Sequence, residues 1–168
     1  LDALTSADNS VAIGHRSQTS TTTGIQNVGV GTQTLQDNTT GQENVAIGHN
    51  ALQLNTTGNS NVAIGQAALD ANTTGTRNLA IGMNAYTASD TENDNLAIGY
   101  SAMTTNTAGG EKNLAIGNYA LDALTDGDTN TAVGYDAGTA VRSGNSNCSF
   151  GNLAGSAVLD GSNNVCIG

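Results

Sequence analysis

The chain has 168 residues, but only 3% of them are aromatic, tryptophan is absent and glycine occurs 22 times. Too few side chains are large enough to fill a thick core between layers, which argues against an ordinary globular domain. The formal net charge is −10 with four scattered cations, Arg16, Arg77, Lys112 and Arg142, so we expect no nucleic-acid partner and no contact with an anionic membrane.

A five-residue motif recurs along the whole chain. It reads SVAIG at 10–14, NVGVG at 27–31, NVAIG at 44–48 and 61–65, NLAIG at 78–82, 95–99 and 113–117, NTAVG at 130–134, NCSFG at 147–151, and NVCIG at 164–168. Successive motifs are 17 residues apart, except for one spacing of 18 between Gly99 and Gly117. A second glycine follows 10 residues after most closing glycines, and Glu92 interrupts that series. This period predicts ten stacked coils, each with two glycine corners.

Each motif has the alternation of a β-strand. Val62 and Ile64 point to one face and Asn61 and Ala63 to the other, whereas a helix would need apolar residues three and four apart. After the corner, a weaker apolar stretch such as Ala51-Leu52 predicts a second short strand. A polar Asn-Thr-Thr-Gly turn follows at 38–41, 55–58 and 72–75.

Seventeen residues cannot form their own core, so we expect the coils to stack in register with parallel pairing. The prediction is an all-β parallel β-solenoid (β-roll), a single repeat domain over 1–168. We expect the 18-residue coil to absorb its extra residue as a turn bulge around Ala108–Glu111, outside the strands.

We predict that the larger residues of the motifs stack inward as the core. They are Val11, Ile13, Val28, Val30, Val45, Ile47, Val62, Ile64, Leu79, Ile81, Leu96, Ile98, Leu114, Ile116, Val133, Phe150, Val165 and Ile167. Asparagine begins nine of the ten motifs, from Asn27 to Asn164, and this row is interpreted as a structural amide ladder.

The small residues at the centre of the motifs form a stripe that another backbone could approach closely, which makes them the candidate interface between chains. They are Ala12, Gly29, Ala46, Ala63, Ala80, Ala97, Ala115, Ala132, Ser149 and Cys166. The alternative is that small residues merely fit a crowded corner. Cys148 and Cys166 are 18 residues apart, so we expect unbonded thiols on opposite faces, with Cys148 inside and Cys166 in the small stripe.

Few residues suggest chemistry. His15 and His49 lie two coils apart in the same row, at about 9.6 Å, too far to share a metal within one chain, and are expected to be exposed turn residues. Tyr100 and Tyr135 in that row are candidate contact anchors. Calcium at Asp90-Glu92-Asp94 or Asp122-Asp126-Asp128 is a weak possibility, and we otherwise expect no cofactor, metal or catalytic site. Sequons occur at Asn38, Asn55, Asn72 and Asn147, mostly where a turn favours asparagine.

Two stretches carry a resemblance to known repeats. NSVAIGHRS at 9–17 resembles the head repeat of trimeric autotransporter adhesins, and NTAVGYDAG at 130–138 resembles repeats of phage tail fibres. The resemblance extends along the whole chain. It implies a left-handed parallel β-roll, three chains packed side by side, and a surface that binds host matrix or cell receptors.

The expected function is therefore a structural and attachment protein, extracellular, on a cell surface or in a virion tail fibre. Expected partners are other copies of the chain, as a homotrimer that also stacks end to end, and a host receptor, matrix or glycan. The alternatives are an ice-binding solenoid and a glycan-degrading tailspike. Because Leu1–Thr5 matches Leu121–Thr125 in phase, we expect the segment to belong to a longer solenoid.

Overall fold

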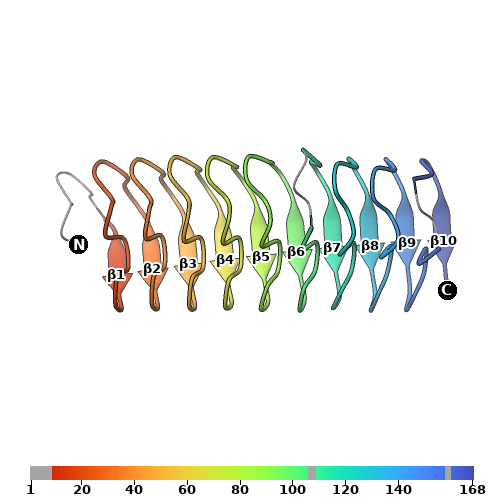
Figure 1. Ribbon diagram of the computed structural model, residues 1–168, viewed down its shortest axis with the longest axis horizontal. Helices are drawn as coiled ribbons and strands as arrows, with labels where there is room; N and C mark the ends of the chain where they lie inside the picture. The colour runs from red at the N-terminus through yellow and green to blue at the C-terminus, as the bar shows by residue number, and fades with distance from the viewer. Residues whose placement is uncertain (1–8, 106–108, 158–159) are drawn as a thin grey trace.

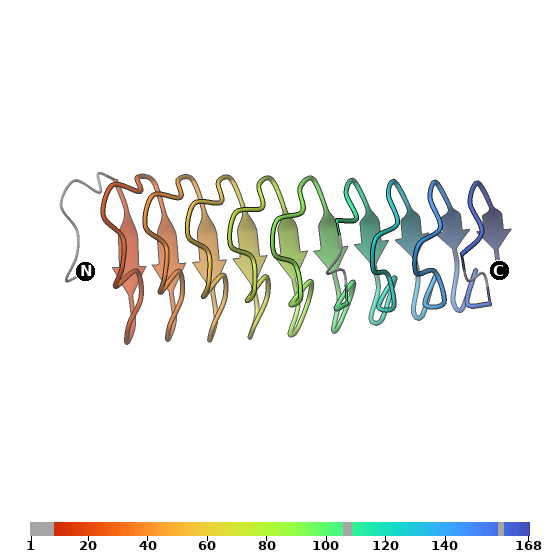
Figure 2. The ribbon, with the colours of Figure 1, turned by 45° about the horizontal axis from the view of Figure 1, so that its top comes forward.

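The computed structural model describes residues 9–105, 109–157 and 160–168, which form one parallel β-solenoid (Figure 1). Its ten three-residue strands are β1 (Val11–Ile13), β2 (Val28–Val30), β3 (Val45–Ile47), β4 (Val62–Ile64), β5 (Leu79–Ile81), β6 (Leu96–Ile98), β7 (Leu114–Ile116), β8 (Thr131–Val133), β9 (Cys148–Phe150) and β10 (Val165–Ile167). They form one sheet in chain order, and the coils follow one another along a rod (Figure 2). The predicted all-β solenoid is confirmed. The stretch Leu1–Thr5 lies outside the described residues.

The register follows the sequence period. Val45 pairs with Val62 and Ala46 with Ala63, 17 residues apart. Between β6 and β7 the offset is 18, with Leu96 beside Leu114, so the extra residue lies outside the strands as predicted. Asn95 Nδ2 donates to the carbonyl of Gly110, 15 residues on, where the other coils use a carbonyl 14 residues on. Ala108 lies outside the described residues.

The predicted second strand is wrong. Ala51 and Leu52 lie in a tight arc, because Asn50 has φ 59° and Leu52 has φ 51°. A residue in the left-handed region cannot continue an extended strand. The arc is still bonded to its neighbours along the rod, since the Leu52 N–H donates to the Ala68 carbonyl at 3.0 Å. The apolar pair therefore marks a buried segment, but its backbone is bent.

The predicted facing of the strands is also wrong, because the centre of each motif points inward. Ala46 and Ala63 are fully buried beside Leu52 and Leu69 of the arcs. The residues on either side face outward and are half-buried or exposed: Val11, Ile13, Val28, Val30, Val45, Ile47, Val62, Ile64, Leu79, Ile81, Leu96, Ile98, Leu114, Ile116, Val133, Phe150, Val165 and Ile167.

The width of the coil explains this arrangement. The strand lies across a thin interior from the arc, and the arc supplies the large side chains, namely Leu35, Leu52, Leu69, Tyr86, Met103 and Leu121. Only a small residue fits opposite them, in keeping with close packing. The former interface candidates Gly29, Ala46, Ala63, Ala80, Ala97, Ala115, Ala132 and Ser149 are therefore core residues, and Ala12 and Cys166 of the outermost strands are half-buried. The alternative interpretation, that small residues merely fit a crowded place, is correct in kind, but the crowded place is the interior opposite the arc and not a corner.

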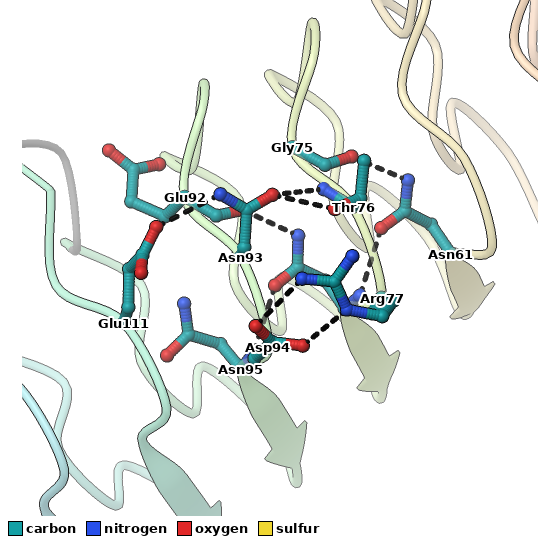
Figure 3. A network of polar contacts seen from close by, with 10 residues as sticks. Asn61, Gly75, Thr76, Arg77, Glu92, Asn93, Asp94, Asn95 and Glu111 are labelled. Carbon is teal, nitrogen blue, oxygen red and sulfur yellow. Dashed lines mark hydrogen bonds and ion pairs between the residues drawn. The ribbon is translucent and has the colours of Figure 1, made fainter.

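The asparagine row is structural, as predicted. Asn61 Nδ2 donates to the Gly75 carbonyl at 2.8 Å, and Asn61 Oδ1 accepts from the Asn78 N–H at 2.9 Å (Figure 3). A second buried row joins Asn38, Asn55 and Asn72, whose amides donate from coil to coil at 2.9 Å. Farther along the rod, Leu124 and Val141 occupy the place of this second row.

Candidate binding surfaces

The outer face of the sheet is an apolar surface that Thr131 of β8 interrupts. We define the outer face as the first and third residues of strands β1 to β10. Leu79, Ile81, Leu96 and Ile98 at its centre are each half-buried, although larger than the buried alanines between them. At about 4.8 Å per strand, the face runs roughly 45 Å along the rod. A contiguous apolar surface of this kind usually marks an interaction site.

The corner row consists of the residue that follows each closing glycine. Its members are mostly polar and include Thr32, Gln66, Asn118 and Asn152. His15 and His49 belong to this row and are exposed, as predicted. Its polar character separates the corner row from the adjoining outer face.

Three tyrosines interrupt this polar corner on the coils of β6, β7 and β8. The ring centroids of Tyr100 and Tyr119 are 5.3 Å apart, with the planes at 77°. Those of Tyr119 and Tyr135 are 6.0 Å apart, at 85°. These edge-to-face contacts join the three residues, which we call the tyrosine cluster. Tyr100 and Tyr135 were predicted as contact anchors, but Tyr119 was not, because it lies one position after the corner row.

Two aspartates accompany the tyrosine cluster. The Asp122 N–H donates to the Tyr119 carbonyl at 3.4 Å, and the Asp136 N–H donates to the Asn118 carbonyl at 3.0 Å. Desolvation raises the pKa of Tyr119, and the neighbouring tyrosines and both aspartates add to the rise. Burial, with repulsion from Asp136, raises the pKa of Asp122. The cluster therefore combines aromatic rings with nearby carboxylates.

The acidic stretch at 90–94 is bonded to the chain's own donors. The Glu92 carboxylate accepts from the N–H groups of Asp90 at 2.8 Å and Gly109 at 3.1 Å. Arg77 Nε lies 2.6 Å from Asp94 Oδ1 and its terminal nitrogen lies 2.9 Å from Oδ2. Figure 3 shows both contacts as dashed lines. This hydrogen bonding lowers the pKa of Asp94.

The second acidic stretch is similar. Asp128 Oδ1 accepts from the Glu111 N–H at 2.8 Å, and Asp126 Oδ1 accepts from the Thr125 hydroxyl at 3.0 Å. In the described part of the chain, no three His, Cys, Asp or Glu side chains come together as metal ligands would.

The two cysteines lie on neighbouring strands. In register, Cys148 is beside Val165 and Cys166 is beside Ser149. The thiols are free and lie on opposite faces, as the spacing predicts, but Cys148 belongs to the outer face and Cys166 to the inner one. The reversed facing of the strand accounts for this correction.

The asparagines of the sequons are core residues. Asn38, Asn55 and Asn72 are fully buried and Asn147 nearly so, and their amides bond to neighbouring groups. Their sequence positions reflect the amide ladders, so the folded coil gives no access for a glycan at these nitrogens.

Among the described residues, no helix has the length and apolar character to cross a membrane. No protein-family model, curated protein or solved structure matches this chain.

Proposed function

We propose that the chain is a structural and attachment segment of an extracellular fibre, a bacterial surface adhesin or a virus tail fibre, in which three parallel copies pack through their outer faces. The observation that carries this proposal is the apolar outer face, where apolar side chains remain partly exposed on all ten strands. Covering that face would remove a large apolar area from water, at about 25 cal/mol per Å².

A copy of the same chain is the partner that fits this face best. The apolar side chains repeat once per strand, about 4.8 Å apart, and a parallel copy repeats at the same pitch. Each chain offers one such face, so rotation about a common axis buries all of them in a closed assembly. The resemblance to adhesin head repeats favours three chains around that axis.

Analytical sedimentation tests the proposal. We expect the wild-type chain to sediment as a trimer, and the double variant I81E/I98E to sediment as a monomer that keeps its β-sheet circular dichroism. The matched control is Thr57→Glu, a charge at an exposed turn away from the sheet, which should remain trimeric. A wild-type chain that is a stable monomer at all concentrations would overturn the proposal.

Substitutions of the small residues at the centre of the strands should give a contrasting result. Because Ala80 and Ala97 are fully buried, A80E/A97E should unfold the solenoid, with loss of β-sheet circular dichroism, and should not release folded monomers. The two double variants thus separate an interface from a core.

The ice-binding alternative is less well supported. Thr40, Thr57 and Thr74 form one exposed row, but the adjacent hydroxyls of Thr39 and Thr56 donate to carbonyls of the next coil at 3.0 Å. The hydroxyls of the second threonine row are therefore used in hydrogen bonds within the solenoid. A thermal-hysteresis measurement that finds activity would favour this alternative.

A further inference from the structure

The tyrosine cluster concentrates the aromatic residues of the chain at one exposed place. The sequence contains four tyrosines and one phenylalanine, and three of these five rings belong to the cluster. Tyr100 is 37% exposed and Tyr135 is 50% exposed. The rings are therefore available to a ligand while their mutual contacts hold them in place.

The local backbone gives no reason for tyrosine at these positions. Tyr119 has φ 61°, and the equivalent places in other coils hold Asn50 and Asn84, which tolerate the left-handed region better. Asn118 and Asn152 fill the corner row in neighbouring coils. Asparagine would thus satisfy the fold at all three positions, so the tyrosines indicate a role at the surface.

The surroundings restrict the kind of ligand. Asp122 and Asp136 lie close enough to raise the pKa of Tyr119, and the net charge of −10 disfavours an anionic ligand. In the described residues the surface has no cavity, so a ligand lies along it. A stable protein partner needs about 800 Å² on each side, far more than three side chains in a polar corner offer.

We propose that the tyrosine cluster binds a neutral oligosaccharide. The C–H groups on the face of a pyranose ring carry partial positive charge and stack on the negative face of an aromatic ring. The sugar hydroxyls donate to the carboxylates of Asp122 and Asp136. Neighbouring rings are nearly perpendicular, at 77° and 85°, so they do not form one flat surface. The exposed rings of Tyr100 and Tyr135, two coils apart along the rod, each offer a face to one sugar of a chain, and Tyr119 lies between them.

This inference deepens the proposed attachment function by naming the ligand class, and it rests on that function. The two are tested separately, because sedimentation reports the packing of copies and glycan binding reports the cluster. Gly99 and Gly134 lie between the outer face and Tyr100 and Tyr135, so tyrosine variants should sediment like the wild type.

The experiment uses the purified chain and a panel of neutral gluco-, galacto-, manno- and N-acetylglucosamine oligomers of six sugars. Saturation-transfer NMR detects binding, and tyrosine fluorescence follows it, because tryptophan is absent. We expect at least one oligomer to bind saturably. Tyr119→Asn and Tyr135→Asn should each weaken that binding about fivefold or more, the loss typical of an anchor residue.

The matched control is Met83→Asn, which removes another exposed apolar residue of the corner row and should leave binding unchanged. Circular dichroism checks that the variants fold; if Tyr119→Asn does not, the more exposed Tyr135→Asn decides the result. No saturable binding to any neutral oligomer would overturn the proposal. Undiminished binding in the variants, or tighter binding of choline or of a sialylated oligomer, would also overturn it.

Discussion

At the scale of single residues, Asp70 is in an unfavourable place. Its Oδ1 atom is buried and has no hydrogen-bond partner among the described residues. Burial raises its pKa above the usual 3.8, and the nearby His49 offsets only part of that rise. The ionised carboxylate is therefore less stable in the folded chain than in the unfolded one.

We predict that Asp70→Gln, which copies Gln53 of the preceding coil, raises the melting temperature at pH 7. The folded pKa lies above the unfolded one, so the wild type loses stability as the pH rises through this interval, and the difference should vanish below pH 3.8. Melting curves of the wild type and the variant between pH 3 and 7 measure this difference in melting temperature. Glu43→Gln, at an exposed position, is the control, and an equal gain at every pH would contradict the explanation.

Gly48 illustrates a second residue-scale constraint. It has φ 134°, and a Cβ atom there would lie 2.5 Å from the Gly65 carbonyl oxygen. We predict that Gly48→Ala costs about 2 kcal/mol or more, from strain and from the collision with the next coil. Gly109→Ala also has a positive φ but no atom within 4 Å, so chemical denaturation should show a clearly smaller loss. Equal losses would show that the collision does not matter.

At the scale of the coil, the essential feature is the pairing of a small strand residue with a large arc residue. We predict that Ala63→Leu overpacks the interior and costs about 1–3 kcal/mol, whereas Ile64→Leu on the outer face costs less. Urea unfolding of both variants measures the difference. If Ile64→Leu costs more than Ala63→Leu, the larger residues of the strand, and not the small ones, would face the interior.

The strands and their register were predictable, but their facing was not. The motif fixes which residues share a face, since alternation has a period of two, but Val62 and Ala63 are both apolar and neither is marked as inner. The deciding information lies in the arc, where Leu69 fills the interior. The arc itself was mistaken for a strand because Ala-Leu pairs do not reveal that Leu69 has φ 52°.

The tyrosine cluster was predicted only in part, again because the sequence pattern does not show where each side chain points. Tyr100 and Tyr135 share a row, so the repeat identifies them, but Tyr119 joins them only through the direction of its ring. Tyrosines on three successive coils, within one position of each other, are the signal that would have found it.

At the scale of the whole molecule, each of the ten strands contacts only the strands next to it along the rod. We predict that deleting residues 44–60, one period, leaves a shorter folded solenoid, because Asn61 then follows Glu43 with both asparagine rows and the glycine corners intact. Its melting temperature should fall by only a few degrees, about the effect of 1 kcal/mol in a chain of this length. Deleting 53–60 breaks the period and should abolish cooperative melting. A collapse of both variants would contradict nearest-neighbour stability.

The second buried row, which changes from Asn72 to Leu124 along the rod, also distinguishes the earlier coils from the later ones. Coils that both carry asparagine can exchange neighbours without leaving an amide unpaired. A chain that skipped ahead to stack Asn55 against Leu124 would leave the buried Asn55 Oδ1 without the Asn72 amide from which it accepts, at a cost of about 1–3 kcal/mol. The near-identical repeats are thus protected against stacking in the wrong order, because this buried row is polar in the earlier coils and apolar in the later ones.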